Sequence, residues 1–259
     1  MSTILALVNA EIVTDPEEIS WISNAIRPYE QMALVNSLVP EKFESRCRIL
    51  HPFKNYATDA EMGWQKVATS LGKDLSPETP CSELTSHPRF KLLELGEPRC
   101  GSLAKSVLDA LLTHIISNNS TDTVMCAIWS GYGWLQGKFA FAELTRKAPN
   151  SLVKQLRIQR IKLPRSVSGV NWVQHCMEIS PQMQYLVYKG PVGILNAFID
   201  QPFKQTPNFW WPISEQSLIV SDLDLEWTYV GGSALLIDRI LNDPRIEAVA
   251  VTGNDRLSS

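Results

Sequence analysis

The C-terminal stretch, residues 217–251, most constrains the fold, because two strand-like segments flank one clear helix there. The expected order is a strand over residues 217–230, a break at Gly231-Gly232, a helix from a Ser233 cap through Leu241, a stop at Asn242-Asp243-Pro244 and a strand over residues 246–251. A unit of this kind packs one helix on a sheet. It predicts a protein of mixed α and β structure.

Two further segments carry clear periodicity. Leucines and other apolar residues recur at helical spacing over residues 102–116, and Thr123–Trp129 is a nearly continuous apolar run of strand length. Weaker patterns predict a helix start at 14–18, a strand at 45–50, a helix at 59–71, strands at 156–163 and 184–189, a helix at 192–199 and a loop at 205–212. We predict a single α+β domain over residues 1–259, with a mixed or antiparallel sheet and a helix-rich N-terminal third. A subdivision near residues 117–122 is the alternative.

Charge argues against a general role in nucleic-acid binding. The chain has 24 basic and 27 acidic side chains and a net charge of −3. It therefore lacks the basic excess with which proteins neutralise a phosphate backbone. One basic stretch, residues 154–165, is interpreted as a solvated face of a strand or helix.

Other features favour the cytoplasm. No apolar run approaches the ~20 residues of a membrane-spanning helix. The apolar residues 4–8 follow no positive charge, which makes a poor signal peptide. The chain has five cysteines, an odd number, and no two of them form a CxxC pair. This pattern does not indicate a disulfide framework, so we expect reduced thiols. We predict a cytoplasmic protein with no membrane partner.

An acidic pattern lies within the long strand expected near the C-terminus. Strand periodicity would place Asp222, Asp224 and Glu226 on one face, with neighbours about 7 Å apart. Three such carboxylates can bind a hard cation or supply a general acid and base. The favoured alternative is a half-buried strand with a solvated acidic face.

Glycine-rich turns give two candidate anion sites. Gly232 and Ser233 precede the C-terminal helix, whose first amides favour an anion, although a serine N-cap explains these residues equally well. The stretch from Gly131 to Lys138 follows a strand, but its glycine spacing fits neither a Walker loop nor a dinucleotide fingerprint. It is interpreted as a tight turn.

Aromatic residues provide a candidate binding surface. Trp210, Trp211, Trp227 and Tyr229 can form walls for a sugar, a base or a partner's side chain. Packing in the core is the favoured alternative, because most tryptophans are largely buried. No nucleophile elbow and no HExxH sequence occurs, and we predict neither a cofactor nor a structural metal site.

Several of these motifs together resemble a family of uncharacterised bacterial proteins. The C-terminal resemblance rests on Trp210-Trp211-Pro212, Asp222-Leu223-Asp224, residues 227–233, Leu236-Ile237-Asp238 and Asp243-Pro244-Arg245. Residues 48–52 with Trp64, and residues 127–133, resemble earlier segments of the same family. The match is scattered over most of the chain and is densest after Trp210. It implies a bacterial cytoplasmic protein, and it carries no activity and no catalytic residue.

These features lead to competing hypotheses about function. The first is a non-catalytic binding module for a protein partner or a small ligand, formed by Trp210, Trp211, Asp222, Asp224, Trp227, Tyr229, Gly232 and Ser233. The second is a metal-assisted hydrolase or transferase that uses Asp222, Asp224 and Glu226. A third is a structural subunit of an assembly. The first two are distinguished by whether the acidic residues, the glycine turn and the tryptophans share one pocket.

Overall fold

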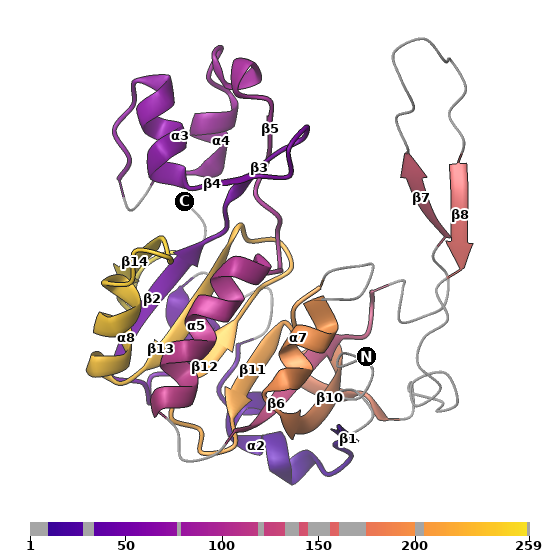
Figure 1. Ribbon diagram of the computed structural model, residues 1–259. Helices are drawn as coiled ribbons and strands as arrows, with labels where there is room; N and C mark the ends of the chain where they lie inside the picture. Colours follow the sequence, from indigo (N-terminus) through magenta and orange to yellow (C-terminus); the bar gives the residue numbers. More distant parts are fainter. Residues whose placement is uncertain are drawn as a thin grey trace.

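A sheet of antiparallel strands forms the centre of the protein (Figure 1). The computed structural model describes residues 10–27, 34–76, 79–118, 122–132, 140–144, 156–160, 175–199 and 205–257. Within these residues the sheet has nine strands, in the order β1-β10-β6-β11-β12-β13-β2-β14, and β9 pairs with β10. The strands are β1 (Glu11–Ile12), β2 (Ser45–Leu50), β6 (Thr123–Trp129), β9 (Met177–Ser180), β10 (Met183–Pro191), β11 (Phe209–Pro212), β12 (Leu218–Val220), β13 (Trp227–Gly232) and β14 (Ala248–Val251). Every pairing is antiparallel.

Strand β6 shows why both faces of this sheet are covered. Its alternate residues Val124, Cys126 and Ile128 belong to one hydrophobic cluster, and Met125 and Ala127 belong to another. A strand places successive side chains on opposite faces, so the two clusters lie on the two sides of the sheet. The predicted strand at Thr123–Trp129, buried on both faces, is confirmed.

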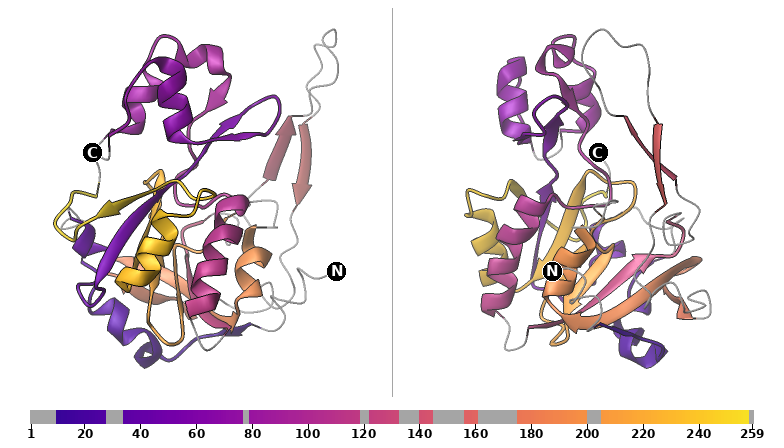
Figure 2. Two further views of the ribbon diagram at one scale, coloured as in Figure 1. Left: turned by 60° about the vertical axis from the view of Figure 1, so that its left-hand side comes forward. Right: turned by 45° about the vertical axis from the view of Figure 1, so that its right-hand side comes forward.

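Helices cover one face and shorter segments cover the other (Figure 2). The first layer consists of α5 (Lys105–Asn118), α7 (Gly193–Ile199) and α8 (Ala234–Leu241), which pack on the cluster of Cys126. The opposite face is covered by the 3₁₀ helix η1 (Pro16–Ile19), α2 (Ser20–Ser23), the 3₁₀ helix η3 (Val35–Ser37) and Leu257. The predicted helices at 102–116 and 192–199 correspond to α5 and α7.

A small lobe, residues 53–96, lies beyond one end of the sheet (Figure 1). It contains β3 (Phe53–Asn55), β4 (Glu61–Met62), α3 (Trp64–Leu71), α4 (Cys81–Thr85), the 3₁₀ helix η4 (Phe90–Leu93) and β5 (Leu95–Gly96). The chain enters it through His51-Pro52 and leaves it through residues 97–104. The ring of Trp64 lies 5.5 Å from that of Phe53 and 6.5 Å from that of Trp227, so the lobe and the sheet share one core.

A separate two-stranded ribbon consists of β7 (Ala140–Leu144) and β8 (Leu156–Arg160). These strands pair with one another in register from Ala140–Arg160 to Leu144–Leu156. Strand β8 corresponds to the first part of the strand predicted at 156–163. Most of the basic stretch at 154–165, and most of the glycine-rich stretch after Tyr132, lie outside the described residues.

Several sequence predictions are wrong. The helix-rich N-terminal third is not found: in its described part, short helices alternate with strands β1 to β4. The helix predicted from residue 59 begins at Trp64, because Asp59 has a positive φ of 62° and β4 follows it. The loop predicted at 205–212 ends in β11, and the strand predicted at 217–230 is interrupted between β12 and β13.

Gly231 and Gly232 are the last two residues of β13, so the predicted break falls after the glycines, at Ser233, and not on them. A Cβ on Gly231 would lie 2.5 Å from Cγ1 of Val39 and 2.8 Å from Cδ2 of Phe43. Glycine at this position therefore reflects the close approach of the covering segment to the sheet, not a turn.

Candidate functional site

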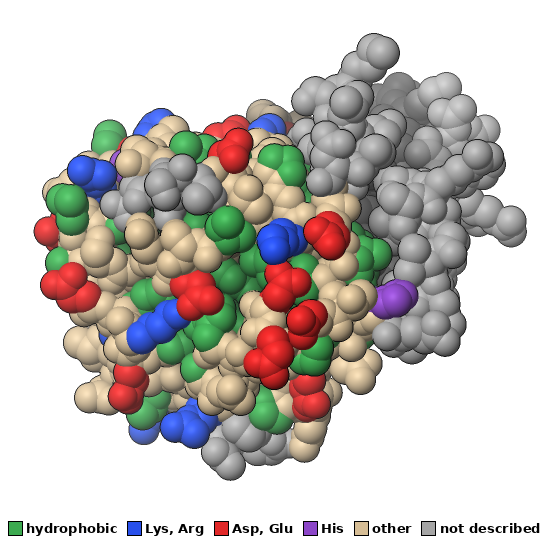
Figure 3. Space-filling model, turned by 90° about the horizontal axis from the view of Figure 1, so that it is seen from below, with side chains coloured by type: hydrophobic (Ala, Val, Ile, Leu, Met, Phe, Trp, Pro, Cys, Tyr) green, Lys and Arg blue, Asp and Glu red, His purple; other side chains and the backbone are tan. Residues whose placement is uncertain are grey.

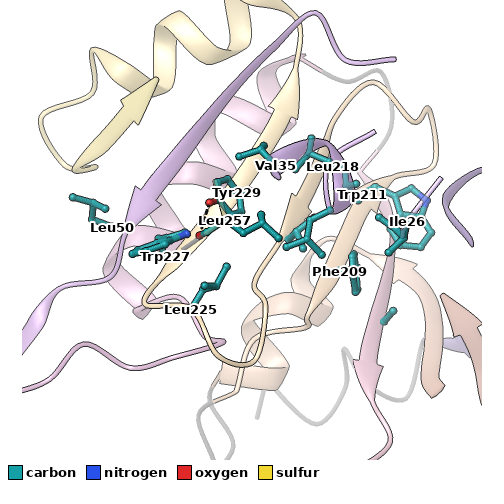
Figure 4. Close-up of a cluster of buried hydrophobic side chains, with 14 of the residues drawn as sticks. Ile26, Val35, Leu50, Phe209, Trp211, Leu218, Leu225, Trp227, Tyr229 and Leu257 are labelled. Carbon is teal, nitrogen blue, oxygen red and sulfur yellow. Dashed lines mark hydrogen bonds between the residues drawn. The ribbon is translucent and has the colours of Figure 1, made fainter. Parts of the chain in front are cut away.

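The four aromatic residues predicted to bind a ligand lie in the core. Trp210 packs under the helices, whereas Trp211, Trp227 and Tyr229 pack on the opposite face of the sheet. Their exposed fractions are 0%, 1%, 2% and 0%. Figure 4 shows Trp211, Trp227 and Tyr229 among Val35, Leu218, Leu225 and Leu257. The rings do not converge on a surface, and the core-packing alternative is confirmed.

The acidic residues lie in a turn, which corrects the predicted strand face. Oδ1 of Asp222 accepts a hydrogen bond from the amide of Asp224 at 3.1 Å, a local bond that competes with strand pairing. Burial raises the pKa of Asp222, and the neighbouring Asp224 raises it further. Among the described residues, no group of three His, Cys, Asp or Glu side chains is arranged to hold a metal ion.

Gly232 and Ser233 lie at the N-terminus of α8, as predicted. The amides in the first turn of this helix, however, are already bound by side chains of the protein. Ser233 Oγ accepts from Leu236 N at 3.3 Å, as the serine N-cap predicts. Glu44 Oε2 accepts from Ala234 N at 3.0 Å. The anion at this helix end is therefore Glu44, a residue 190 positions away in the chain.

The structure shows a different candidate site, a pocket of about 530 Å³ between the small lobe and the helix layer. We call it the His51 pocket. Its apolar lining is formed by Pro52, Leu103, Ala104 and Ile199, and its polar lining includes His51, Arg99 and Ser102. Lys54, Asp59, Glu61, Glu97 and Lys105 complete the wall.

His51 is held rigidly by hydrogen bonds to both ring nitrogens. Nδ1 lies 2.6 Å from the carbonyl oxygen of Arg99, which can only accept, so Nδ1 carries the proton. Nε2 therefore accepts from the hydroxyl of Thr228 at 2.8 Å. Thr228 Oγ1 also lies 2.7 Å from Ser221 Oγ, which continues the buried chain. Burial is the main reason that the pKa of His51 falls from 6.5 to about 4, so the imidazole is neutral.

The segment that follows Arg99 is fixed by a second network. Arg99 Nη2 donates to Gln205 Oε1 at 3.2 Å, and Gln205 Nε2 donates to the carbonyl oxygen of Gly101 at 2.6 Å. Thr206 accepts from Leu103 N at 3.1 Å. Gly101 has a φ of 67°, a conformation that glycine adopts without strain. The polar wall of the pocket is therefore set before any ligand arrives.

The first turn of α5 opens into the same pocket. The amides of Lys105, Ser106 and Val107 have no hydrogen-bond acceptor among the described residues, and Ala104 before them has no side-chain oxygen. The first turns of α3 and α8, in contrast, receive carboxylates from Glu247 and Glu44. Unbonded amides at a helix N-terminus favour a negatively charged or strongly polar group.

Sequence reasoning missed this pocket because its residues come from four separate parts of the chain. No short motif joins residues 51, 61, 99, 103 and 199. The local signals were His51-Pro52 directly after a predicted strand and Ser102 at the start of a predicted helix. Each of these signals is also expected at an ordinary strand end or helix start, so neither indicates a site by itself.

Three other hollows lined by described residues, of about 500, 890 and 570 Å³, are each more open to solvent than the His51 pocket. On the face in Figure 3, Lys and Arg side chains are scattered, and several acidic side chains gather to the right of the centre. None of the helices in the described ranges is long and apolar enough to cross a membrane. Compared with known protein families, curated proteins and solved structures, the chain gives no match.

Proposed function

We propose that this protein is a binding module that holds a small polar molecule in the His51 pocket. The observation that carries the proposal is the pocket itself. Its volume of about 530 Å³ lies within the ~300–1,000 Å³ that is typical of small-molecule sites. Its position where the small lobe meets the helix layer is also typical of such sites.

The lining supports a ligand with polar and apolar parts. Leu103 and Ile199 are buried apolar side chains, and they lie beside the fixed polar groups of Arg99 and Ser102. Ligand sites commonly combine a mainly apolar wall with a few precisely held polar groups that determine orientation. The amides of α5 add donors whose bonds a polar ligand can complete.

The state of His51 favours binding over catalysis. A general base needs a ring nitrogen within reach of the proton that it removes. Both nitrogens of His51 are already bonded, to Arg99 O and to Thr228 Oγ1, inside the protein. His51 thus orders the wall of the pocket and offers no lone pair to a ligand.

The test combines a ligand screen with a variant that fills the pocket. Unfolding midpoints are measured with amino acids, nucleotides, sugars, sugar phosphates and dicarboxylates. A ligand at a hundred times its Kd adds about 2.7 kcal/mol to the free energy of unfolding. We expect at least one compound to raise the midpoint of the natural protein but not that of Ala104→Phe, whose ring would occupy the pocket.

Ala250→Phe serves as the matched control. Ala250 is an exposed alanine on β14, away from the pocket, so this variant should respond to the ligand as the natural protein does. A compound that stabilises Ala104→Phe equally well would contradict the proposal. So would the absence of any response across the panel.

A further inference from the structure

We propose that strand β14 is a dimer interface, at which two copies of this protein pair edge to edge and join their sheets. β14 ends the strand order of the nine-stranded sheet, and β2 is its only strand partner among the described residues. The strand lies at the left-hand margin of the sheet in Figure 1. The edge of a sheet presents backbone N–H and C=O groups that another strand can bind. This proposal does not depend on the His51 pocket.

Two residues of β14 direct their backbone groups away from the sheet. The amide of Leu50 donates to the carbonyl oxygen of Glu247 at 2.8 Å, which makes these residues a hydrogen-bonded pair of the β2–β14 ladder. Hydrogen-bonded and non-hydrogen-bonded pairs alternate along an antiparallel ladder. Ala248 and Ala250 take non-hydrogen-bonded positions in this register, so their N–H and C=O groups point to the outer edge.

These outer groups are free in the single chain. Ala248 and Ala250 form no hydrogen bond with any described residue outside the β2–β14 ladder. The next outward amide, that of Thr252, donates to Oδ2 of Asp255 at 2.8 Å and is therefore occupied. The outer edge thus offers two residues for pairing, and the bond to Asp255 marks where it stops.

The free groups determine the register of the dimer. A two-fold axis at Val249 places Ala248 opposite Ala250 of the partner subunit, and Ala250 opposite Ala248 of the partner subunit. Both are hydrogen-bonded pairs, so the N–H and C=O groups of both alanines gain a partner. An axis at Ala250 would instead require the amide of Thr252, which Asp255 already binds.

The charge of β14 favours a second copy as the partner. A two-fold axis brings each side chain near its own copy, so a charged strand would repel itself. All residues of β14 are alanine or valine, and Val249 would face Val249 of the partner subunit. Edge strands are commonly protected by charged residues, proline or bulges, and β14 has none of these. The opposite edge of the sheet differs, because β1 has two residues and one of them is Glu11.

The first test is sedimentation of the natural protein over roughly a hundred-fold range of concentration, because association depends on concentration. The mass should rise from 29.1 kDa, the mass of one chain, towards twice that value. Hydrogen exchange at the amides of Ala248 and Ala250 should slow over the same range. A protein that keeps the mass of one chain at every concentration would overturn the proposal.

Charge substitution at Val249 tests whether the axis passes through this residue. Val249→Lys and Val249→Glu should each be monomeric, because like charges would face each other across the axis. An equimolar mixture of the two variants should recover the dimer, because lysine then faces glutamate. A variant that dimerises alone as the natural protein does, or a mixture that stays monomeric, would overturn β14 as the interface.

Ala250→Pro tests the backbone bond without a change of charge. Proline removes the amide that points away from β2, so the thermal midpoint of the single chain should be retained while the dimer is lost. Ala250→Val is the matched control, because it keeps the amide and should dimerise as the natural protein does. A dimer that persists in Ala250→Pro would place the contact elsewhere and overturn the proposal.

Discussion

Glu247 binds the first turn of α3 at Trp64, 183 residues away in the chain. Its Oε2 accepts from the amide of Trp64 and its Oε1 from the amide of Gln65, both at 2.6 Å. The N-cap position is Gly63, which has no side chain to satisfy these amides. Glu247 thus acts as an N-cap from a distance and ties the small lobe to the segment before β14.

Replacement of Glu247 by Ala should lower the free energy of unfolding by about 1–2 kcal/mol, the usual cost of losing an N-cap. The change leaves two amides without their acceptor, and chemical denaturation in urea would measure it. Glu11→Ala, an exposed acid on the edge strand β1, is the control and should change stability little. Equal effects of the two substitutions would contradict the capping role.

A second prediction concerns two glycines with opposite surroundings. A Cβ at Gly231 would collide with Val39 and Phe43, whereas a Cβ at Gly193, on α7, would meet nothing within 4 Å. Gly231→Ala should therefore destabilise the protein by about 1–3 kcal/mol through overpacking. Gly193→Ala should leave stability unchanged or raise it by up to about 1 kcal/mol, because alanine favours a helix. Thermal unfolding of both variants checks the sign, and a stable Gly231→Ala would refute the close packing.

Local patterns in the sequence predicted much of the fold. The apolar run of β6, the helical spacing of α5 and the Ser233 cap each depend on residues that are neighbours in the chain. The sheet order was beyond prediction, because it depends on which distant strands pair. The His51 pocket was missed for the same reason: Gln205 and Thr228, which bind Arg99 and His51, reach these partners across more than 100 residues.

The errors at the candidate site have a local cause as well. Alternation over residues 222–226 is typical of a strand, but the side chain of Asp222 bonds the amide of Asp224 and forms a turn. Likewise, aromatic residues at strand spacing fit a binding surface and a core equally well. The segments that cover this face of the sheet show that the aromatic residues belong to the core, because Val35 and Leu257 pack in the same cluster as Tyr229.

Asp243 provides the third prediction. It accepts from Arg245 Nη2 at 2.6 Å and lies 2.7 Å from His114 Nε2, which joins the end of α8 to α5. Hydrogen bonds from Arg245 hold the pKa of Asp243 well below its usual value of 3.8. The Asp243 carboxylate therefore contributes its full stabilisation of the folded state above about pH 4. That contribution is lost as the pH falls further, because the carboxylate becomes protonated.

Asp243→Asn should cost about 1–2 kcal/mol at neutral pH, because it removes charge-assisted hydrogen bonds. Denaturant titrations at pH 7 and pH 3 would show the variant and the natural protein converging at the lower pH. Asp238→Asn, an exposed acid on α8, is the control. A stability difference that persists unchanged at pH 3 would contradict the assignment.

The buried imidazole of His51 provides the last prediction, in a separate range of pH. Burial lowers the pKa of His51 to about 4 in the folded protein, whereas the unfolded chain keeps the ordinary 6.5. Between these values the unfolded state binds a proton that the folded state does not. Stability should therefore fall as the pH drops from 6.5 towards 4, by about 3 kcal/mol in total, since one pKa unit corresponds to about 1.4 kcal/mol.

His51→Gln should flatten this part of the pH profile, because glutamine does not titrate. The variant loses stability at pH 7, where Thr228 and the carbonyl of Arg99 lose the geometry of their bonds to the ring, but the loss relative to the natural protein should shrink as the pH falls to 4. His87→Gln, at a half-buried position in the small lobe, should leave the profile as it is. Urea midpoints at half-unit steps of pH distinguish these results. A natural protein equally stable at pH 6.5 and pH 4.5 would show that His51 takes up its proton without unfolding the buried chain to Thr228 and Ser221.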